Sequence, residues 1–370
     1  MVKIKIEILI YSYLAVCASM IIFNIVCIFV FKRRDKRTER YKTRFGNRIK
    51  EELKKDTVSA EHKRYLSENL RHTKNIISFD KVLEEMYGNN PEKTRRYIDE
   101  LTPVFLYLTL EYAKKSEMEA AYFPYIISKY KFCKKHRIKI IIDTMLTLVK
   151  SPSLYCRENA LRALYVMGDC ESIITALKII DTRGLYFHSK LISDGLQDFD
   201  ENEEKLSSAL WSELNTFSEK MQLAILNYFR FSSGSHKERF FQLLKDKNTP
   251  TEIVYCAVRY FGRYYYEPAY HYLVNYAKTA NESHWEYAAI AASALSNYPG
   301  QKTVEILTEL LKSRNWHVRY NASQSLIELG TEYPEFAEIF EGDDRYAAEI
   351  LRYRFEQKRM KEKEAAAANE

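Results

Sequence analysis

Residues 154–169, LYCRENALRALYVMGD, and residues 316–330, WHVRYNASQSLIELG, carry one pattern that decides the fold of this chain. In each stretch an apolar residue is followed directly by an arginine. A small residue lies three positions after the arginine, and a leucine lies four positions after the small residue. Ala160 and Leu164 hold the last two positions in the first stretch, and Ala322 and Leu326 hold them in the second. Because residues four apart share one face of a helix, both stretches predict a helix that buries the same edge.

The small position recurs through the second half of the chain at a nearly constant spacing. Four looser copies lie between the two clear ones, and an apolar residue again follows by four in each. The successive positions are 32, 33, 32, 34 and 31 residues apart, which is the signature of a repeat architecture. These positions are Ala160, Ile192, Ile225, Ala257, Ala291 and Ala322.

A second helix is predicted between each pair of copies, because apolar residues recur there at three- and four-residue spacing. These second helices are expected over residues 172–180, 208–217, 238–246, 269–278 and 304–312. Each unit is therefore a helix–turn–helix that is too small to bury its own apolar face, and stacking on its neighbours completes the core. The sequence predicts an all-α solenoid.

These units resemble HEAT repeats, an armadillo-type helical family, in the compact and membrane-anchored form found in bacterial proteins. The resemblance covers roughly residues 117–357 and implies a right-handed α-α superhelix. With helical caps at both ends, the solenoid is expected over residues 79–357. Tetratricopeptide and armadillo arrays are the competing assignments, but the Trp, Gly, Tyr and Pro pattern of the former is not found.

Residues 8–31, ILIYSYLAVCASMIIFNIVCIFVF, form an uncharged run of 24 residues and predict a single transmembrane helix. A helix of this length reaches about 36 Å, enough to cross a hydrocarbon core of about 30 Å. The alternative is a cleaved signal peptide, whose apolar region is usually shorter, about 7–15 residues. The length of the run and the basic residues that follow it favour a retained anchor. Residues 1–7 are then an extracytoplasmic stub.

A basic cluster follows the apolar run directly and predicts its orientation. The positive-inside rule places the C-terminal side in the cytoplasm, so the predicted location is the cell membrane with a single pass and a cytoplasmic C-terminal domain. The cluster is either a stop-transfer signal or a contact for anionic lipid headgroups. Residues 32–78 are expected to be a basic juxtamembrane segment, and residues 358–370 a disordered tail. The cluster comprises Lys32, Arg33, Arg34, Lys36, Arg37 and Arg40.

The positive charge of the chain is confined to this part. Of the net charge of +7, residues 32–75 supply +9 through 16 Lys/Arg and 7 Asp/Glu, and residues 1–31 supply +1. Residues 76–370 therefore carry −3, whereas a nucleic-acid-binding body is expected to be basic. The six cysteines form no C-x-x-C pair, which fits free thiols in a reducing compartment.

The sequence predicts no catalytic, cofactor-binding or metal-binding residues. The eight histidines do not form a metal-binding motif, and no Gly-rich phosphate loop or G-x-S-x-G motif occurs. Seven of the 29 tyrosines lie in residues 259–278. They are interpreted either as rings packed between helices or as a partner-binding groove, since exposed aromatic and Arg side chains often carry binding energy. The candidate partner-binding residues are Arg263, Tyr266, Tyr272 and Tyr276.

The function predicted from these features is that of a membrane-anchored cytoplasmic scaffold or regulatory subunit that binds a protein partner, itself membrane-associated. By analogy of fold, one interpretation is an accessory of envelope machinery such as a membrane glycosyltransferase or transporter. The alternatives are a nucleic-acid-binding HEAT-like protein and, less specifically, an enzyme with an unrecognised site. The scaffold is favoured because solenoids present extended surfaces to partners.

Overall fold

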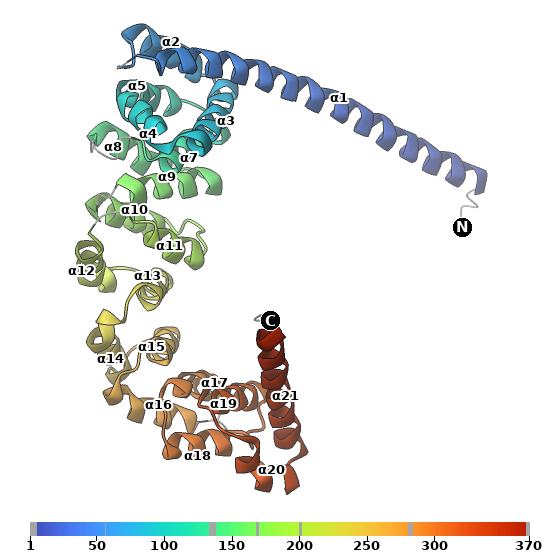
Figure 1. The fold of residues 1–370 in the computed structure, drawn as a ribbon, viewed down its shortest axis with the longest axis vertical. Helices are drawn as coiled ribbons and strands as arrows, with labels where there is room; N and C mark the ends of the chain where they lie inside the picture. The colour runs from blue at the N-terminus through green and yellow to red at the C-terminus, as the bar shows by residue number, and fades with distance from the viewer. Residues whose placement is uncertain are drawn as a thin grey trace. The chain divides into compact units, whose positions relative to one another are not determined.

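The computed structural model describes residues 6–55, 57–132, 138–167, 170–199, 202–279 and 284–367. The side chains of residues 6–9, Arg34 and Arg37 lie outside this description. Helices joined by short loops make up these residues, and none of the described residues forms a strand. The predicted all-α repeat fold is confirmed (Figure 1).

The chain forms two compact units. The first comprises Met1–Tyr186 with Asp198–Asn202, and the second comprises Phe187–Gln197 with Glu203–Glu370. The stretch predicted as one solenoid, residues 79–357, is therefore divided near residue 187. Helix α11 (Ser189–Gln197) belongs to the second unit because it packs against α13 (Glu219–Ser232).

The first unit joins one long helix to a series of short ones. Its helices are α1 (Ile6–Glu52), α2 (Ala60–Leu70), α3 (Thr73–Asn89), α4 (Pro91–Glu100), α5 (Thr102–Tyr112), α6 (Glu117–Ala120), α7 (Tyr122–Tyr130), α8 (Lys139–Leu148), α9 (Leu154–Met167) and α10 (Cys170–Thr182). Helix α1 packs on α3, α2 on α5, and α7 on α9. The Phe45 ring of α1 lies 6.0 Å from the Tyr65 ring of α2 and 6.1 Å from the Phe79 ring of α3.

Helix α1 continues far beyond the apolar run, which differs from the predicted boundaries. Residues 32–52 extend α1, and the predicted start of the solenoid at residue 79 falls inside α3. The physical reason is an apolar edge within the basic segment. Phe45 and Ile49 are four apart, share one helix face and are buried in the first unit.

The C-terminal end also differs from its prediction as a disordered tail. Residues 358–367 are helical and form the last part of α21 (Arg345–Ala367), where the side chains are mostly exposed. Their Lys, Glu and Ala residues are among the strongest helix formers, so the helix continues without a buried face. Residues 368–370 of the predicted tail lie outside the described residues, as do residues 1–5 of the predicted stub.

The second unit alternates first and second helices of the repeat. Its remaining elements are α12 (Glu203–Glu213), η1 (Leu214–Thr216), η2 (Gly234–His236), α14 (Lys237–Lys245), α15 (Thr251–Arg263), η3 (Glu267–Ala269), α16 (Tyr270–Ala277), α17 (Trp285–Ala294), η4 (Leu295–Asn297), α18 (Gln301–Leu310), α19 (Trp316–Glu328), η5 (Tyr333–Phe336) and α20 (Ala337–Glu341). The first helices α11, α13, α15, α17 and α19 each contact the next, so they form one row. Helix α14 packs on α15, α16 on α17, and α18 on α19 (Figure 1).

The repeat positions predicted from the sequence lie in the core. None of the six positions, and none of the apolar residues four further on, is more than 2% exposed. Four of the six positions hold alanine. Helices α15 and α17 also approach closely at Gly262, one residue beyond the buried Phe261, where an added Cβ would lie 2.9 Å from the Cα of Ala294.

The arginine of the repeat pattern holds the loop that precedes its helix. Arg157 donates through Nη1 to the carbonyl oxygen of Ser151 at 2.8 Å. Arg319 donates through Nε to the carbonyl oxygen of Ser313, also six residues back, and through Nη1 to Asp344 at 2.8 Å. In both clear repeat copies this arginine therefore donates to a loop carbonyl six residues back.

Buried tyrosines tie one repeat of the second unit to the loop of the preceding repeat. The Tyr260 hydroxyl donates to the Ser233 carbonyl oxygen at 3.1 Å and accepts from the His236 amide at 3.0 Å. The Tyr298 hydroxyl donates to the carbonyl oxygen of Tyr266 at 3.3 Å. Part of the high tyrosine content thus serves packing, with each hydroxyl satisfied by backbone groups.

Replacing Ala322 with Asp is expected to destabilise the second unit by about 3–5 kcal/mol, because the carboxylate would be buried without a partner. Urea unfolding of the full chain in mild detergent, followed by far-ultraviolet circular dichroism, measures this. The matched control is Lys312→Asp at an exposed position, which should cost less than about 1 kcal/mol. Equal effects of the two substitutions would show that Ala322 is not a core position.

Candidate functional site

A groove on the first-helix row of the second unit is lined by three arginines. The groove has a volume of about 590 Å³ and is bordered by side chains of α13, α15, α17 and α19. Its basic residues come from two helices, and small residues of α17 form part of its floor. The lining residues include Arg230, Arg259, Gly262, Arg263, Ser293 and Glu328.

The local sequence explains why arginines face this groove. Arg259 and Arg263 lie four apart on α15 and therefore share a face. Each stands two residues beyond a buried repeat position, Ala257 or Phe261, which is about 200° around the helix. The face that carries the arginines is thus the one turned away from the core. Gly262 lies between them where α15 and α17 approach closely.

The three arginines lack carboxylate partners. Arg259 and Arg263 are exposed and Arg230 is half-buried, and none forms an ion pair with an acidic residue in the part of the chain that the structure describes. The Nε atom of Arg230 is buried without a hydrogen-bond acceptor. Burial, together with the charges of Arg259 and Arg263, lowers the pKa of Arg230 from its ordinary value. The groove is consequently lined by three arginines without an ion-pair partner among the described residues, and by one glutamate, Glu328.

An exposed aromatic ring holds two of these arginines. The Arg230 guanidinium carbon lies 4.4 Å from the centroid of the Phe231 ring, and that of Arg263 lies 5.5 Å from it. Phe231 is 41% exposed. Stacking on a ring fixes a guanidinium plane while its N–H groups stay available to a ligand. This arrangement resembles the aromatic-and-arginine composition of binding hot spots.

The structure separates the four partner-binding candidates predicted from the sequence. Only Arg263 lines the groove. The rings of Tyr266 and Tyr272 both pack on Phe241 of α14, at 5.6 and 5.5 Å. The Tyr276 ring instead stacks on Tyr287 of α17 at 5.0 Å. None of the three tyrosines lines the groove with Arg263.

The candidates predicted from the sequence do not include Arg230, Phe231 or Arg259, which lie in or beside the groove. The available signal was the pair Arg259 and Arg263 on the face opposite the repeat positions. Arg230 had no local signal, since only packing of α13 against α15 brings it to that pair.

The second candidate feature is α1. Among the described residues it is the one helix long and apolar enough to cross a membrane, with a mean hydropathy of 2.7 in its most apolar window. Its described side chains from Ile10 to Phe31 are exposed, apart from the partly exposed Cys17 and Cys27. An apolar helix in this position is either a membrane span or a signal sequence.

The basic cluster predicted after the apolar run lies on exposed turns of α1. Lys32, Arg33, Lys36 and Arg40 are exposed and form no ion pair within the described residues. The Arg34 and Arg37 side chains lie outside the description. Farther along, Lys42 pairs with Glu85 of α3 and Arg48 with Glu61 of α2. The helix thus passes from free basic residues to residues engaged with the first unit.

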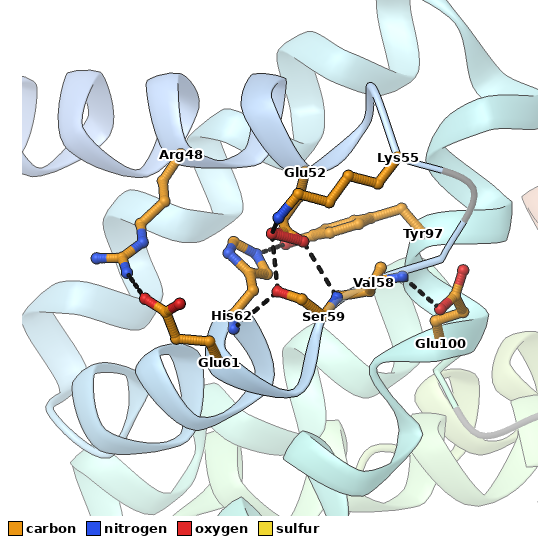
Figure 2. A network of polar contacts seen from close by, with 9 residues as sticks. All are labelled: Arg48, Glu52, Lys55, Val58, Ser59, Glu61, His62, Tyr97 and Glu100. Carbon is orange, nitrogen blue, oxygen red and sulfur yellow. Dashed lines mark hydrogen bonds and ion pairs between the residues drawn. The ribbon is translucent and has the colours of Figure 1, made fainter.

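A polar network fastens the end of α1 to α2 and α4, and Figure 2 shows its members. The buried Glu52 carboxylate accepts from the Lys55 ammonium and from the amide and hydroxyl of Ser59 at 3.1 and 2.8 Å. His62 lies 2.8 Å from the Tyr97 hydroxyl through Nε2. The turn after α1 is therefore fixed from both sides.

Electrostatics show how strongly this turn is held. Burial alone would raise the pKa of Glu52, but the hydrogen bonds from Lys55 and Ser59 outweigh it and lower the pKa to about 2. Burial lowers the pKa of His62, so the imidazole that faces Tyr97 is neutral near pH 7. The network carries one buried anion with a full set of donors.

Comparisons with known proteins agree with the repeat architecture. Residues 276–352, which include the repeat positions Ala291 and Ala322, match the family model of HEAT repeats. No curated protein sequence shows significant similarity to this chain.

Two crystal structures of engineered proteins are similar to parts of the chain. One is 14% identical, with a TM-score of 0.33, and the match covers 80% of this chain and 94% of that one. The other is 17% identical, with a TM-score of 0.22, over 68% of this chain and 95% of that one. Both scores are low, and the function proposed below rests on the chain's own residues.

Replacing Glu52 with Gln is expected to destabilise the first unit by about 1–3 kcal/mol at pH 7, because buried donors lose a charged acceptor. The lowered pKa gives the sign of the pH dependence. The contribution of Glu52 is present above its unfolded pKa of about 4.5 and is lost as the pH falls toward about 2. The stability difference between wild type and E52Q should therefore shrink across that range.

The matched control is Glu61→Gln, which removes an exposed ion pair with Arg48 and should cost less than about 1 kcal/mol. Unfolding of the full chain in detergent at a series of pH values measures both variants. A constant difference between wild type and E52Q down to pH 2 would contradict the assignment.

Proposed function

We propose that this chain, a HEAT-like helical repeat protein, is a membrane-anchored cytoplasmic scaffold that binds a protein partner through its repeats. The observation that carries the proposal is the continuity of α1. One helix runs from an exposed apolar segment into the packed first unit, where Phe45 and Ile49 are buried. The same helix can therefore anchor the chain and support its folded part.

The exposed apolar segment supports the anchor. Large apolar side chains line all sides of α1 from Ile10 to Phe31, and the first unit does not cover them. A surface of this kind is rare on a soluble protein and marks an interaction site. Each Leu, Ile, Phe or Val at the centre of a spanning helix favours insertion by about 0.3–0.6 kcal/mol.

The basic turns of α1 support the predicted orientation. They lie in residues 32–45, the part of α1 between the apolar run and the first unit, which we call the stem. From Phe31 to Phe45 the helix rises about 21 Å, at 1.5 Å per residue. Lys32, Arg33, Lys36 and Arg40 occupy the first part of this stem, within about a Debye length or two of the membrane surface. Anionic headgroups would contribute about 1 kcal/mol for each such residue. The positive-inside rule places this side in the cytoplasm.

The repeats support a protein as the partner. The second unit presents a row of first helices with a groove and exposed arginines, and residues 76–370 together carry a slight net negative charge. Tethering confines such a surface to the membrane, which raises its effective concentration toward membrane proteins. We therefore favour a membrane-associated partner, such as a component of envelope machinery that the scaffold assists. Tyr266 and Tyr272, packed on Phe241, are a candidate second contact.

Paired topology reporters test the anchor. A reporter active only in the cytoplasm, fused after residue 45 or at the C-terminus, is expected to be active, and one active only outside the cytoplasm is expected to be silent. The chain should stay in the membrane fraction after alkaline extraction, whereas a variant lacking residues 1–31 should be released. Activity of the outside reporter, or a mature chain that mass spectrometry finds without residues 1–31, would overturn the anchor.

Site-specific crosslinking in intact membranes tests partner binding. A photoreactive residue replaces Ser293, which is exposed in the groove, or Lys302, which is exposed on α18 of the second-helix row. A discrete protein adduct is expected from position 293 and not from position 302. Adducts from neither position, or equal adducts from both, would contradict the use of this groove by a partner.

A further inference from the structure

We propose that the groove of the second unit binds an acidic segment of a protein, whose carboxylates are received by Arg230, Arg259 and Arg263. This inference rests on the proposed scaffold function and names the chemistry of the partner. A segment with two or three closely spaced Asp or Glu residues fits it, because three guanidinium groups from two adjacent helices face one groove.

Charge is the first argument. Arginines on helical proteins are commonly paired with carboxylates of the same fold, as Arg162 is with Glu158 and Arg345 with Glu349 in this chain. The groove arginines instead repel one another, and this repulsion contributes to the lowered pKa of Arg230. Bound carboxylates would remove the repulsion and supply an acceptor for the unsatisfied Nε of Arg230.

Geometry is the second argument. A guanidinium presents a planar fork of N–H donors that matches the two oxygens of a carboxylate. Phe231 holds the guanidinium groups of Arg230 and Arg263 against its ring, which leaves less side-chain freedom to be lost on binding. The site is partly ordered before a ligand arrives, as expected for a binding surface rather than for freely moving surface charges.

The opposite wall of the groove restricts where the acidic residues of a ligand can lie. Glu328 of α19 lines the groove and is exposed. Its carboxylate, which accepts from Gln324 at 2.8 Å, would repel an anion placed beside it. The acidic residues of a ligand are therefore expected over α13 and α15, and a neutral or basic residue is expected near α19. A bound segment is therefore expected to lie in the groove in one orientation.

This wall also favours a protein segment over a nucleic acid. A nucleic-acid strand carries a charge on every residue and is bound by basic grooves that follow its backbone over several nucleotides. Here the positive charge covers two helices and is followed by a glutamate. Residues 76–370, which include the groove, together carry −3. A short acidic peptide matches this limited patch better.

The test measures binding of a fluorescein-labelled hexaglutamate peptide to the full chain in mild detergent, by fluorescence anisotropy. R259E/R263E is expected to weaken binding at least about tenfold relative to wild type, because two attractive charges become repulsive. K247E/K302E is the matched control. It makes the same change in net charge at exposed positions outside the groove and should change affinity less than about threefold.

A second variant separates guanidinium recognition from charge alone. R259K/R263K keeps both charges but lacks the planar fork, so it should bind more weakly than wild type and more tightly than R259E/R263E. Because α1 also carries free basic residues, all proteins are compared in a background with Lys32, Arg33, Lys36 and Arg40 changed to Gln. Far-ultraviolet circular dichroism and melting temperature establish that each variant is folded.

Three results would overturn the inference. These are absence of hexaglutamate binding by wild type, equal weakening by R259E/R263E and K247E/K302E, and tighter arginine-dependent binding of a labelled single-stranded oligonucleotide than of hexaglutamate. The last would assign the groove to nucleic acid. Crosslinking from position 293 in membranes, without arginine-dependent hexaglutamate binding, would leave the scaffold standing and refute only the acidic ligand. Arginine-dependent hexaglutamate binding without a crosslink would support the acidic site and count against the scaffold.

Discussion

The close approach of successive first helices is the constraint on which the repeat structure depends. Each helix–turn–helix repeat has too little apolar surface to fold alone, so it must bury one edge against the next repeat. The residues at that edge are fully buried, as Ala257, Ala291 and Ala322 show. Two polar bonds join the same helices where they meet, since Asn321 and Ser325 of α19 donate to carbonyl oxygens of α17 at 2.8 and 2.7 Å.

This constraint also determines where binding residues can lie. Once the repeat edge of α15 is committed to packing, positions about half a turn away must face outward, and Arg259 and Arg263 occupy them. The close contact at Gly262 brings α17 beside them, so that small side chains border the charges. A groove lined by small residues and arginines follows from how closely the helices pack, without any insertion or long loop.

The sequence predicted well the features that recur at a regular interval. It predicted poorly the features that depend on contacts between residues far apart in the chain. The six repeat positions were found because packing imposes a buried apolar residue, most often alanine, at a nearly constant interval. The continuation of α1 through the basic segment was missed, because two buried residues, Phe45 and Ile49, are hidden among exposed charges. Arg230 could not be assigned to the groove either, since its neighbours are 29 and 33 residues away. The sequence left two interpretations of the tyrosines open, because a ring packed between helices and a ring in a groove have the same composition.

Continuity of α1 distinguishes this arrangement from a flexible tether. A flexible Gly/Ser linker would raise the local concentration of the repeats but would not orient them. Residues 32–45 are instead helical and contain no Gly or Pro that would bend the helix. At its far end, Glu52 fixes the following turn with three donors, so little freedom remains there. If the apolar run spans a membrane, its tilt is transmitted along the stem to the first unit. The anchor then sets the orientation of that unit as well as its distance from the membrane.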